Sequence, residues 1–126
     1  RLGVRVHVYE PTADCPASHV AARTWQAGYD DTGALRDFAA SVDVVTYEFE
    51  NVPPAALDTI EALRPVRPGR RALVTSRDRL DEKTYLAGLG LMTAPFAAVA
   101  SQADLDAALA GIGAPAILKT RTLGYD

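Results

Sequence analysis

The chain has 126 residues, of which 48% are hydrophobic and 23% are charged, and its formal net charge is −3. This length suits one compact domain, or one small domain with part of another, and the balanced charge excludes the basic excess typical of a nucleic-acid-binding protein. The single cysteine, Cys15, cannot form an internal disulfide, and no apolar run approaches 18 residues. We therefore expect a cytoplasmic protein that binds neither nucleic acid nor a membrane.

The first part of the chain alternates strand-like and helix-like patterns. Valines at every second position from Val4 to Val8 predict a strand, and residues 24–27 form a second short candidate. A helix capped by Asp30 or Asp31 follows, and a strand around residues 44–45 precedes a helix that begins at a proline pair. The side chains expected to face the core from these two helices are Leu35, Phe38, Ala39 and Val42, and then Leu57, Ile60 and Leu63. This order predicts a parallel α/β sheet.

The second part begins near Thr75. "SRDRLDEKTYLAGLG", residues 76–90, is typical of a capped helix that ends at a glycine, and residues 93–100 are expected to be extended. Ser101 and Asp104 give a Ser-x-x-Asp helix start. "APAILKT", residues 114–120, is then predicted to be a strand that carries a lysine near its end.

Two groups of cations are candidates for a functional role. Lys119 follows an apolar segment and precedes a polar turn, so it could reach a phosphate as a point charge, or it could simply extend from a strand end into solvent. Arg79 and Lys83 lie one helical turn apart among acidic residues, which also describes an ordinary helix face with salt bridges.

Acidic residues at two predicted strand ends are the other candidates. In "VVTYEFENVP", residues 44–53, Glu48 and Glu50 alternate after a buried strand, and this pattern fits either a solvated edge or a ligand-facing end. Glu10 ends the first strand, where a dinucleotide fold can place a ribose-binding acid. His7 and His19 have no partners at metal-ligand spacing, so no metal site is expected on them.

Three segments together resemble a known family. "VVTYEFENVP", "SRDRLDEKTYLAGLGLMTAPF" and "PAILKTRTLGYD" are similar, in this order, to segments of the 5-(carboxyamino)imidazole ribonucleotide synthase family of ATP-grasp enzymes in purine biosynthesis. The resemblance implies a Rossmann-like parallel-sheet domain over residues 1–74, followed by the beginning of an ATP-grasp domain over residues 75–126. It also implies that ATP phosphorylates bicarbonate to carboxyphosphate, which then carboxylates the amine of aminoimidazole ribonucleotide, with Mg²⁺ as cofactor. A homodimer is expected.

The resemblance also assigns roles to individual residues. Arg79 and Lys119 match positions that contact ATP, and Glu48 matches an acid that holds the ribonucleotide substrate. Gly124, Tyr125 and Asp126 match the start of the phosphate-covering loop, in which the Tyr and Asp also face the ribonucleotide; Asp126 is the candidate catalytic residue. Leu123 stands where some members have glycine.

Parts of the family pattern lie outside these residues. The first strand with its glycine-rich loop is expected before Arg1, and the rest of the phosphate loop with the acidic Mg²⁺ ligands after Asp126, so 126 residues alone are expected to be catalytically incomplete. Two rival functions stay open. One is a formate-using ATP-grasp transformylase of purine synthesis, against which "TYEFENVP" argues. The other is a non-catalytic Rossmann-like module that binds a dinucleotide through Glu10.

Overall fold

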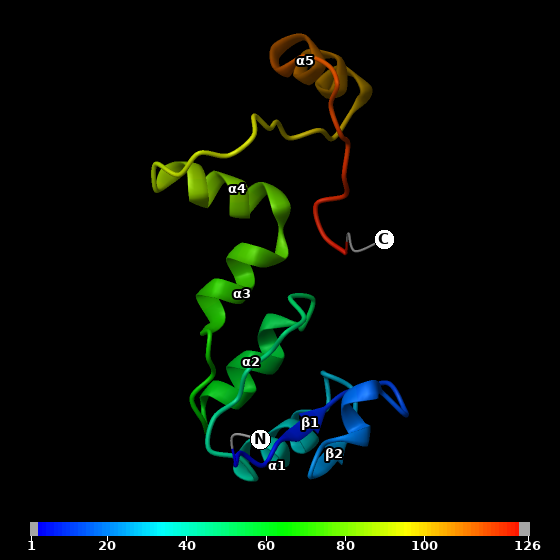
Figure 1. The fold of residues 1–126 in the computed structure, drawn as a ribbon, viewed down its shortest axis with the longest axis vertical. Coiled ribbons are helices and arrows are strands. Elements are labelled where there is room, and N and C mark those ends of the chain that lie inside the picture. Colours follow the sequence, from blue (N-terminus) through cyan, green and yellow to red (C-terminus); the bar gives the residue numbers. More distant parts are fainter. Residues whose placement is uncertain (1–2, 124–126) are drawn as a thin grey trace. The chain divides into compact units, whose positions relative to one another are not determined.

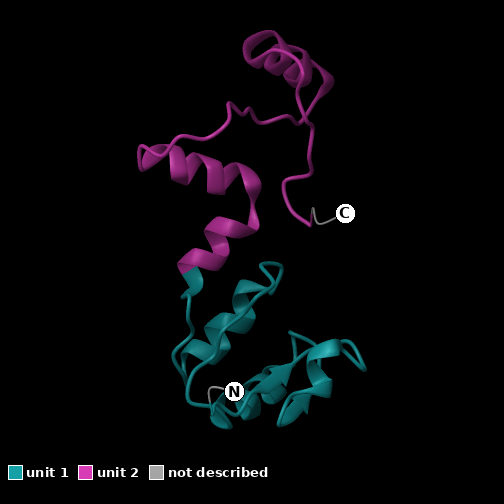
Figure 2. Ribbon diagram, in the orientation of Figure 1, with its two compact units in different colours: residues 1–70 teal, residues 71–126 magenta. Residues whose placement is uncertain are grey.

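The computed structural model describes residues 3–123, and the chain divides into two compact units (Figure 2). Unit 1 spans residues 1–70 and unit 2 spans residues 71–126. Within the described residues, unit 1 contains two short strands, a 3₁₀ helix and two α-helices (Figure 1). Their bounds are β1 His7–Tyr9, η1 Pro16–His19, β2 Arg23–Trp25, α1 Thr32–Ala40 and α2 Pro54–Glu61.

The pairing of β1 with β2 is parallel, which confirms the α/β prediction. His7 lies opposite Arg23 and Tyr9 opposite Trp25, and an isolated parallel bridge joins Val45 to Val66. Parallel neighbours need a crossover of about a dozen residues or more, and the segment with η1 supplies it here.

The first predicted strand is shorter in the structure than the valine pattern indicates. Val4 and Val6 lie before β1 and are 74% and 54% exposed. The Val6 carbonyl still accepts a hydrogen bond from Ala22 N–H at 2.8 Å. Alternation identifies residues able to form a strand, but the strand extends only as far as its backbone finds a paired neighbour.

Helix α1 packs against β1 through an aromatic contact and a polar one. The Tyr9 and Phe38 ring centroids are 5.4 Å apart, and His7 Nδ1 lies 2.9 Å from Ser41 Oγ just past the end of α1. Ser41 Oγ donates its proton to the Phe38 carbonyl at 2.7 Å, so it accepts from His7. An aromatic contact and a hydrogen bond therefore join β1 to the C-terminal part of α1.

The core of unit 1 lies mainly between α1 and α2. Asp31 caps α1 by accepting from Ala34 N–H at 2.9 Å, and Pro53 is the N-cap of α2, as the sequence predicts. The buried apolar residues of the unit are Leu35, Phe38, Ala39, Val45, Val52, Ala56, Leu57, Ile60 and Val66. The prediction for Leu63 is wrong: α2 ends at Glu61, so the helical repeat stops and Leu63 is 45% exposed.

Unit 2 and its junction with unit 1 are helical, and part of this was not predicted. The helices are α3 Arg70–Arg77, α4 Arg79–Gly88 and α5 Gln102–Ile112. The sequence pattern does not predict helix α3, because it buries a single apolar residue, Leu73, and so shows no apolar stripe.

Helix α5 confirms its predicted start. Ser101 Oγ accepts from Asp104 N–H at 3.2 Å, and Asp104 Oδ2 accepts from Ala100 N–H at 3.0 Å. This reciprocal arrangement satisfies backbone donors at the start of the helix, and the hydrogen bond from Ala100 N–H lowers the pKa of Asp104. The helix nevertheless buries no residue, and its large apolar side chains Leu109 and Ile112 are 41% and 39% exposed.

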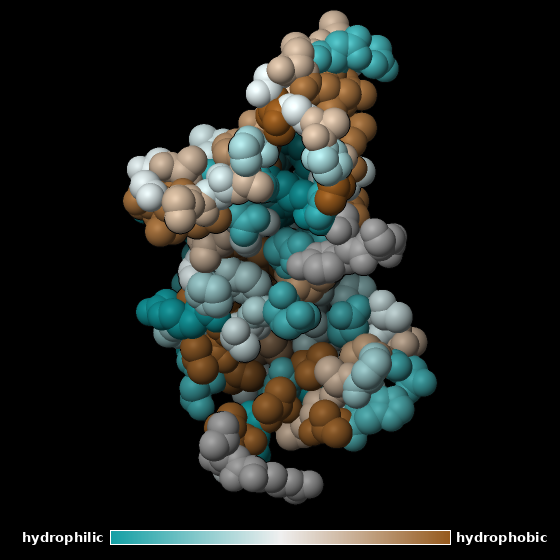
Figure 3. Space-filling model, turned by 45° about the horizontal axis from the view of Figure 1, so that its top comes forward, coloured by the Kyte–Doolittle hydropathy of each residue, from teal (hydrophilic) through white to brown (hydrophobic). Residues whose placement is uncertain are grey.

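The predicted strand over residues 114–120 is wrong for the described chain. This segment is irregular, and Ile117 and Leu118 are 82% and 65% exposed. Strands need a paired neighbour, and none of the pairings found within residues 3–123 involves this segment. Large apolar side chains therefore reach the molecular surface, where Figure 3 shows hydrophobic residues in brown.

Candidate functional site

The first turn of α4 places Arg79, a predicted ATP contact. Asp78 is the N-cap residue, and its Oδ1 accepts from Leu80 N–H at 2.9 Å and from Asp81 N–H at 3.2 Å. These bonds satisfy two of the backbone donors that an α-helix leaves free at its start. Arg79 is the first helical residue and is partly buried.

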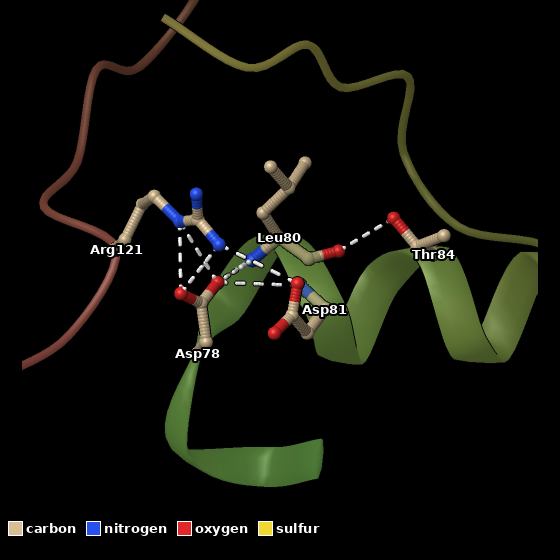
Figure 4. A network of polar contacts seen from close by, with 5 residues as sticks. All are labelled: Asp78, Leu80, Asp81, Thr84 and Arg121. Atoms are coloured by element: carbon tan, nitrogen blue, oxygen red, sulfur yellow. Dashed lines mark hydrogen bonds and ion pairs between the residues drawn. The ribbon is translucent and has the colours of Figure 1, made fainter. Parts of the chain in front are cut away.

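Arg121 joins a segment 43 residues further along the chain to this turn. Its carbonyl accepts from Arg79 N–H at 2.9 Å. Its guanidinium contacts Asp78 through Nε, at 2.8 Å from Oδ2 and 3.1 Å from Oδ1, and through Nη2, at 2.7 Å from Oδ2 (Figure 4). Nη2 also lies 3.4 Å from Asp81 Oδ1. One arginine therefore contacts the turn through both its backbone and its side chain.

The charges of this cluster stabilise each other. The hydrogen bond from Arg121 is the main reason that the pKa of Asp78 lies below its ordinary value, and the Asp81 and Leu80 N–H groups act in the same direction. Asp78 in turn raises the pKa of Arg121. Both groups are consequently ionised at neutral pH.

Lys119, the second predicted ATP contact, belongs to the segment that Arg121 holds. It is exposed and lies two residues before Arg121. Consecutive Cα atoms are about 3.8 Å apart, so the Cα of Lys119 is at most about 7 Å from that of Arg121. The structure thus brings Lys119 and Arg79 to the same part of unit 2, although 40 positions separate them in the sequence.

Lys83 has a different environment from Arg79, although both lie on α4. Its Nζ lies 5.5 Å from the centroid of the Phe96 ring, a distance compatible with a cation–π contact. Lys83 thus contacts the extended segment that follows α4.

The segment with Glu48 is not a strand end. Residues 46–51 are irregular, so the alternation that would place Glu48 and Glu50 on one face does not apply. Glu48 is exposed and Glu50 is partly buried. The segment is anchored by buried Val45 and Val52 on either side, and Val45 N–H donates to the Pro65 carbonyl at 2.9 Å. Glu48 therefore lies on a short loop with fixed ends in unit 1.

Glu10, the acid of the rival dinucleotide reading, has a local partner. Its Oε1 accepts from Thr12 N–H at 2.9 Å, which stabilises the turn after β1. Nearby, burial is the main cause that raises the pKa values of Tyr9 and Tyr29, whose rings stack at 5.9 Å.

Gly124, Tyr125 and Asp126 lie outside the described residues. Within residues 3–123, no three His, Cys, Asp or Glu side chains cluster as a metal site requires. No helix in the same residues is long and apolar enough to cross a bilayer.

Sequence reasoning missed Arg121 and the role of Asp78. In the sequence, Asp78 is one of several acids around Arg79 and Lys83, and no pattern distinguishes Arg121. The only local signal was an acid at a helix start, which identifies a cap but not its distant partner. An ion pair across 43 residues leaves no periodic pattern to detect.

The parallel β1–β2 pair with α1 packed on it defines an α/β domain of the Rossmann-like class. Residues 1–77 match the family described as the ribonucleotide synthetase preATP-grasp domain, so the chain belongs to this family.

Relatives of known identity match along the whole chain. N5-carboxyaminoimidazole ribonucleotide synthase of Brucella melitensis is 47% identical over 126 residues, which is 100% of this chain and 35% of that protein. Among solved structures, the N5-carboxyaminoimidazole synthetase of Staphylococcus aureus complexed with ADP is 39% identical with a TM-score of 0.88, covering 97% of this chain and 33% of that one. The Aspergillus clavatus synthase in complex with ADP and 5-aminoimidazole ribonucleotide is 26% identical with a TM-score of 0.81, over 98% and 34% of the two chains. The chain thus spans about a third of the length of these relatives.

Proposed function

We propose that this chain forms part of an ATP-grasp ligase that carboxylates 5-aminoimidazole ribonucleotide with bicarbonate. The observation that carries the proposal is 47% identity to such a synthase over all 126 residues, which include the segments with Glu48, Arg79 and Lys119. The ADP and ribonucleotide in the similar Aspergillus structure support the same two ligands.

The proposed reaction has two steps, a phosphoryl transfer and a carboxyl transfer. A bicarbonate oxygen attacks the γ-phosphorus of ATP, and the bond to the β-phosphate oxygen breaks, giving carboxyphosphate and ADP. The carboxyl carbon is then transferred to the exocyclic amine, the C–O bond to phosphate breaks, and the amine loses a proton. The products are 5-(carboxyamino)imidazole ribonucleotide and phosphate.

In this proposal the cations of unit 2 bind ATP. Arg79 and Lys119 offset the negative charge of the phosphates, and the contact between their two segments supports a shared ligand. Gly124, Tyr125 and Asp126 begin the loop that covers the phosphates, with Asp126 in the catalytic role and Tyr125 and Asp126 also facing the ribonucleotide. The corresponding domains are residues 1–74 and 75–126, and the division into compact units at residue 70 is compatible with them.

The acid Glu48 binds the ribonucleotide. Its exposure on a loop with anchored ends leaves its carboxylate accessible to the hydroxyl or amine donors of a ligand. Mg²⁺ neutralises phosphate charge when it is bound. None of residues 3–123 is assigned to the metal, because they hold no cluster of three or more candidate ligands. Dimerisation and a cytoplasmic location stay predictions.

The test is ADP release by the full-length protein with ATP and Mg²⁺, with and without each remaining substrate. We expect release to depend on both bicarbonate and 5-aminoimidazole ribonucleotide. No stimulation by the ribonucleotide would refute the proposal. Activity with formate in place of bicarbonate would indicate the transformylase, and tight NAD binding without ATP hydrolysis would indicate the dinucleotide module.

A further inference from the structure

The contact between Arg121 and the start of α4 is the most extensive polar cluster in the described part of unit 2. We define the Arg121 clamp as the side-chain contacts of Arg121 with Asp78 and Asp81, together with the Arg79 N–H to Arg121 carbonyl bond. Its members come from residues 78–81 and from a segment some 40 positions later (Figure 4). The clamp therefore fixes two segments that share no secondary structure.

The geometry restricts orientation as well as position. A single ion pair would let the segment pivot around its charge. Here a backbone hydrogen bond of 2.9 Å and a side-chain contact through two nitrogens start from the same residue. Two anchors on one residue define the direction in which the chain enters and leaves it.

Stability alone does not account for this arrangement. The Arg121 side chain is 56% exposed, and exposed ion pairs contribute little to folding because water competes for both charges. The Asp78 side chain is 19% exposed and already accepts a hydrogen bond from a backbone N–H group at the start of α4. The helix cap therefore does not need Arg121. What the pair does determine is where residues 119–123 lie relative to the first turn of α4.

The clamp holds together the two segments that carry the proposed ATP contacts, Arg79 and Lys119. Arg79 follows Asp78 directly, and Lys119 lies two residues before Arg121. Their charges can act on one nucleotide only while the two segments stay together. An ångström of misplacement can reduce binding or catalysis by orders of magnitude.

We propose that Arg121 is a positioning residue, which holds the Lys119 segment against the first turn of α4 so that Lys119 and Arg79 face the phosphates of the same nucleotide. This inference rests on the proposed function for the identity of the nucleotide. It assigns Arg121 no contact with the nucleotide itself, since its guanidinium faces Asp78 and Asp81.

A direct phosphate contact by Arg121 is the alternative, and Asp78→Asn separates the two. Asparagine keeps a side-chain oxygen for the helix cap but removes the charge that holds Arg121. If Arg121 positions Lys119, this variant weakens nucleotide binding. If Arg121 binds phosphate directly, releasing it from Asp78 leaves binding unchanged or tightens it.

The experiment measures ADP affinity by calorimetry and kcat and KM for ATP in the full-length protein. The variants are Arg121→Met, Arg121→Lys, Asp78→Asn and the double variant Arg121→Met with Asp78→Asn. We expect Arg121→Met to raise the Kd for ADP and the KM for ATP about tenfold, with the KM for the ribonucleotide changed less than about twofold. Asp78→Asn should cause a similar loss, and the double variant should be no worse than Arg121→Met, because both changes break one contact. Arg121→Lys should fall between Arg121→Met and the wild type, since a lysine keeps the charge but not the fork.

Arg70 provides a matched control. Its Nε lies 2.6 Å from Asp58 Oδ1, and the two side chains are 46% and 51% exposed, so this is also an exposed Arg–Asp pair, but it lies in unit 1. Arg70→Met should leave ADP affinity within about twofold of the wild type.

Three results would overturn the inference: an unchanged ADP Kd in either Arg121→Met or Asp78→Asn, tighter binding in Asp78→Asn, or an equal loss in Arg70→Met. If Arg121→Met fails to fold, Arg121→Lys and Asp78→Asn decide the question by the same readouts. Failure of the proposed function is distinguishable, because it appears in the wild type as ADP release without ribonucleotide dependence.

Discussion

Each of the two units is stabilised internally by a different kind of interaction. Of the ten apolar residues buried within residues 3–123, nine lie in unit 1, and only Leu73 lies in unit 2. Helices α4 and α5 bury none, and the contacts at the start of α4 include a cap and the Arg121 clamp. Substitutions in unit 1 should therefore act mainly on folding, whereas those at the polar cluster of unit 2 should act mainly on ligand binding.

The largest expected effect is on the folding of unit 1. Leu35 is 1% exposed on α1, and Leu35→Ala should lower the free energy of unfolding by about 2–5 kcal/mol, because it removes buried methyl groups and leaves a cavity. Chemical denaturation of the full-length protein checks this. Leu109→Ala is the control in α5, where the side chain is 41% exposed. A loss of stability in Leu109→Ala as large as that in Leu35→Ala would contradict this difference between the units.

Lys119→Ala should have the next largest effect, and on ATP rather than on folding. Removing a charged phosphate contact should raise the KM for ATP about 10- to 100-fold, while an exposed lysine leaves the melting temperature almost unchanged. Steady-state kinetics with a thermal melt measures both quantities. Lys83→Ala is the matched control, since Lys83 contacts Phe96, and its KM for ATP should stay within about twofold. Unchanged ATP dependence in Lys119→Ala would refute the assigned role.

Glu48→Gln tests whether unit 1 also carries a ligand contact. We expect the KM for the ribonucleotide to rise about tenfold and the KM for ATP to change much less, because a neutral amide weakens a charge-assisted hydrogen bond. Glu50→Gln, two residues along the same loop, should have the smaller effect. Equal losses for both substrates, or a larger effect of Glu50→Gln, would contradict the choice of Glu48.

The smallest expected effect is that of pH on the Arg121 clamp. The hydrogen bond from Arg121 lowers the pKa of Asp78 from its ordinary 3.8. A pKa that is lower in the folded state stabilises the fold above the unfolded value, and this contribution is lost only as the pH falls through the folded value. We therefore expect the ratio of ADP Kd values for Arg121→Met and the wild type to vary less than about twofold between about pH 6 and 8. A ratio that changes several-fold over this range would mean that another titrating group controls the clamp.

The elements that sequence reasoning predicted well are those encoded by neighbouring residues. Asp31, Ser101 and the proline pair at 53–54 begin helices as expected, because a cap acts on backbone groups two or three positions away. The stripe of α1 is confirmed for Leu35, Phe38 and Ala39. Helix α3 was missed because one buried leucine among arginines shows no period, and residues 114–120 were overpredicted because an apolar run does not reveal whether a partner strand is present.

For the candidate site, the sequence alone determined which residue types are available and in what order, including an acid after the strand-like run and two cations in the second part of the chain. It also carried the family resemblance, which the match over residues 1–77 confirms. Only the tertiary structure shows that the segments with Arg79 and Lys119 lie close together, that Glu48 lies on a loop, and that Arg121 forms an ion pair with Asp78. The physical reason is distance along the chain: caps and helical stripes act within a few residues, whereas an ion pair across 43 residues forms only when the fold brings its partners together.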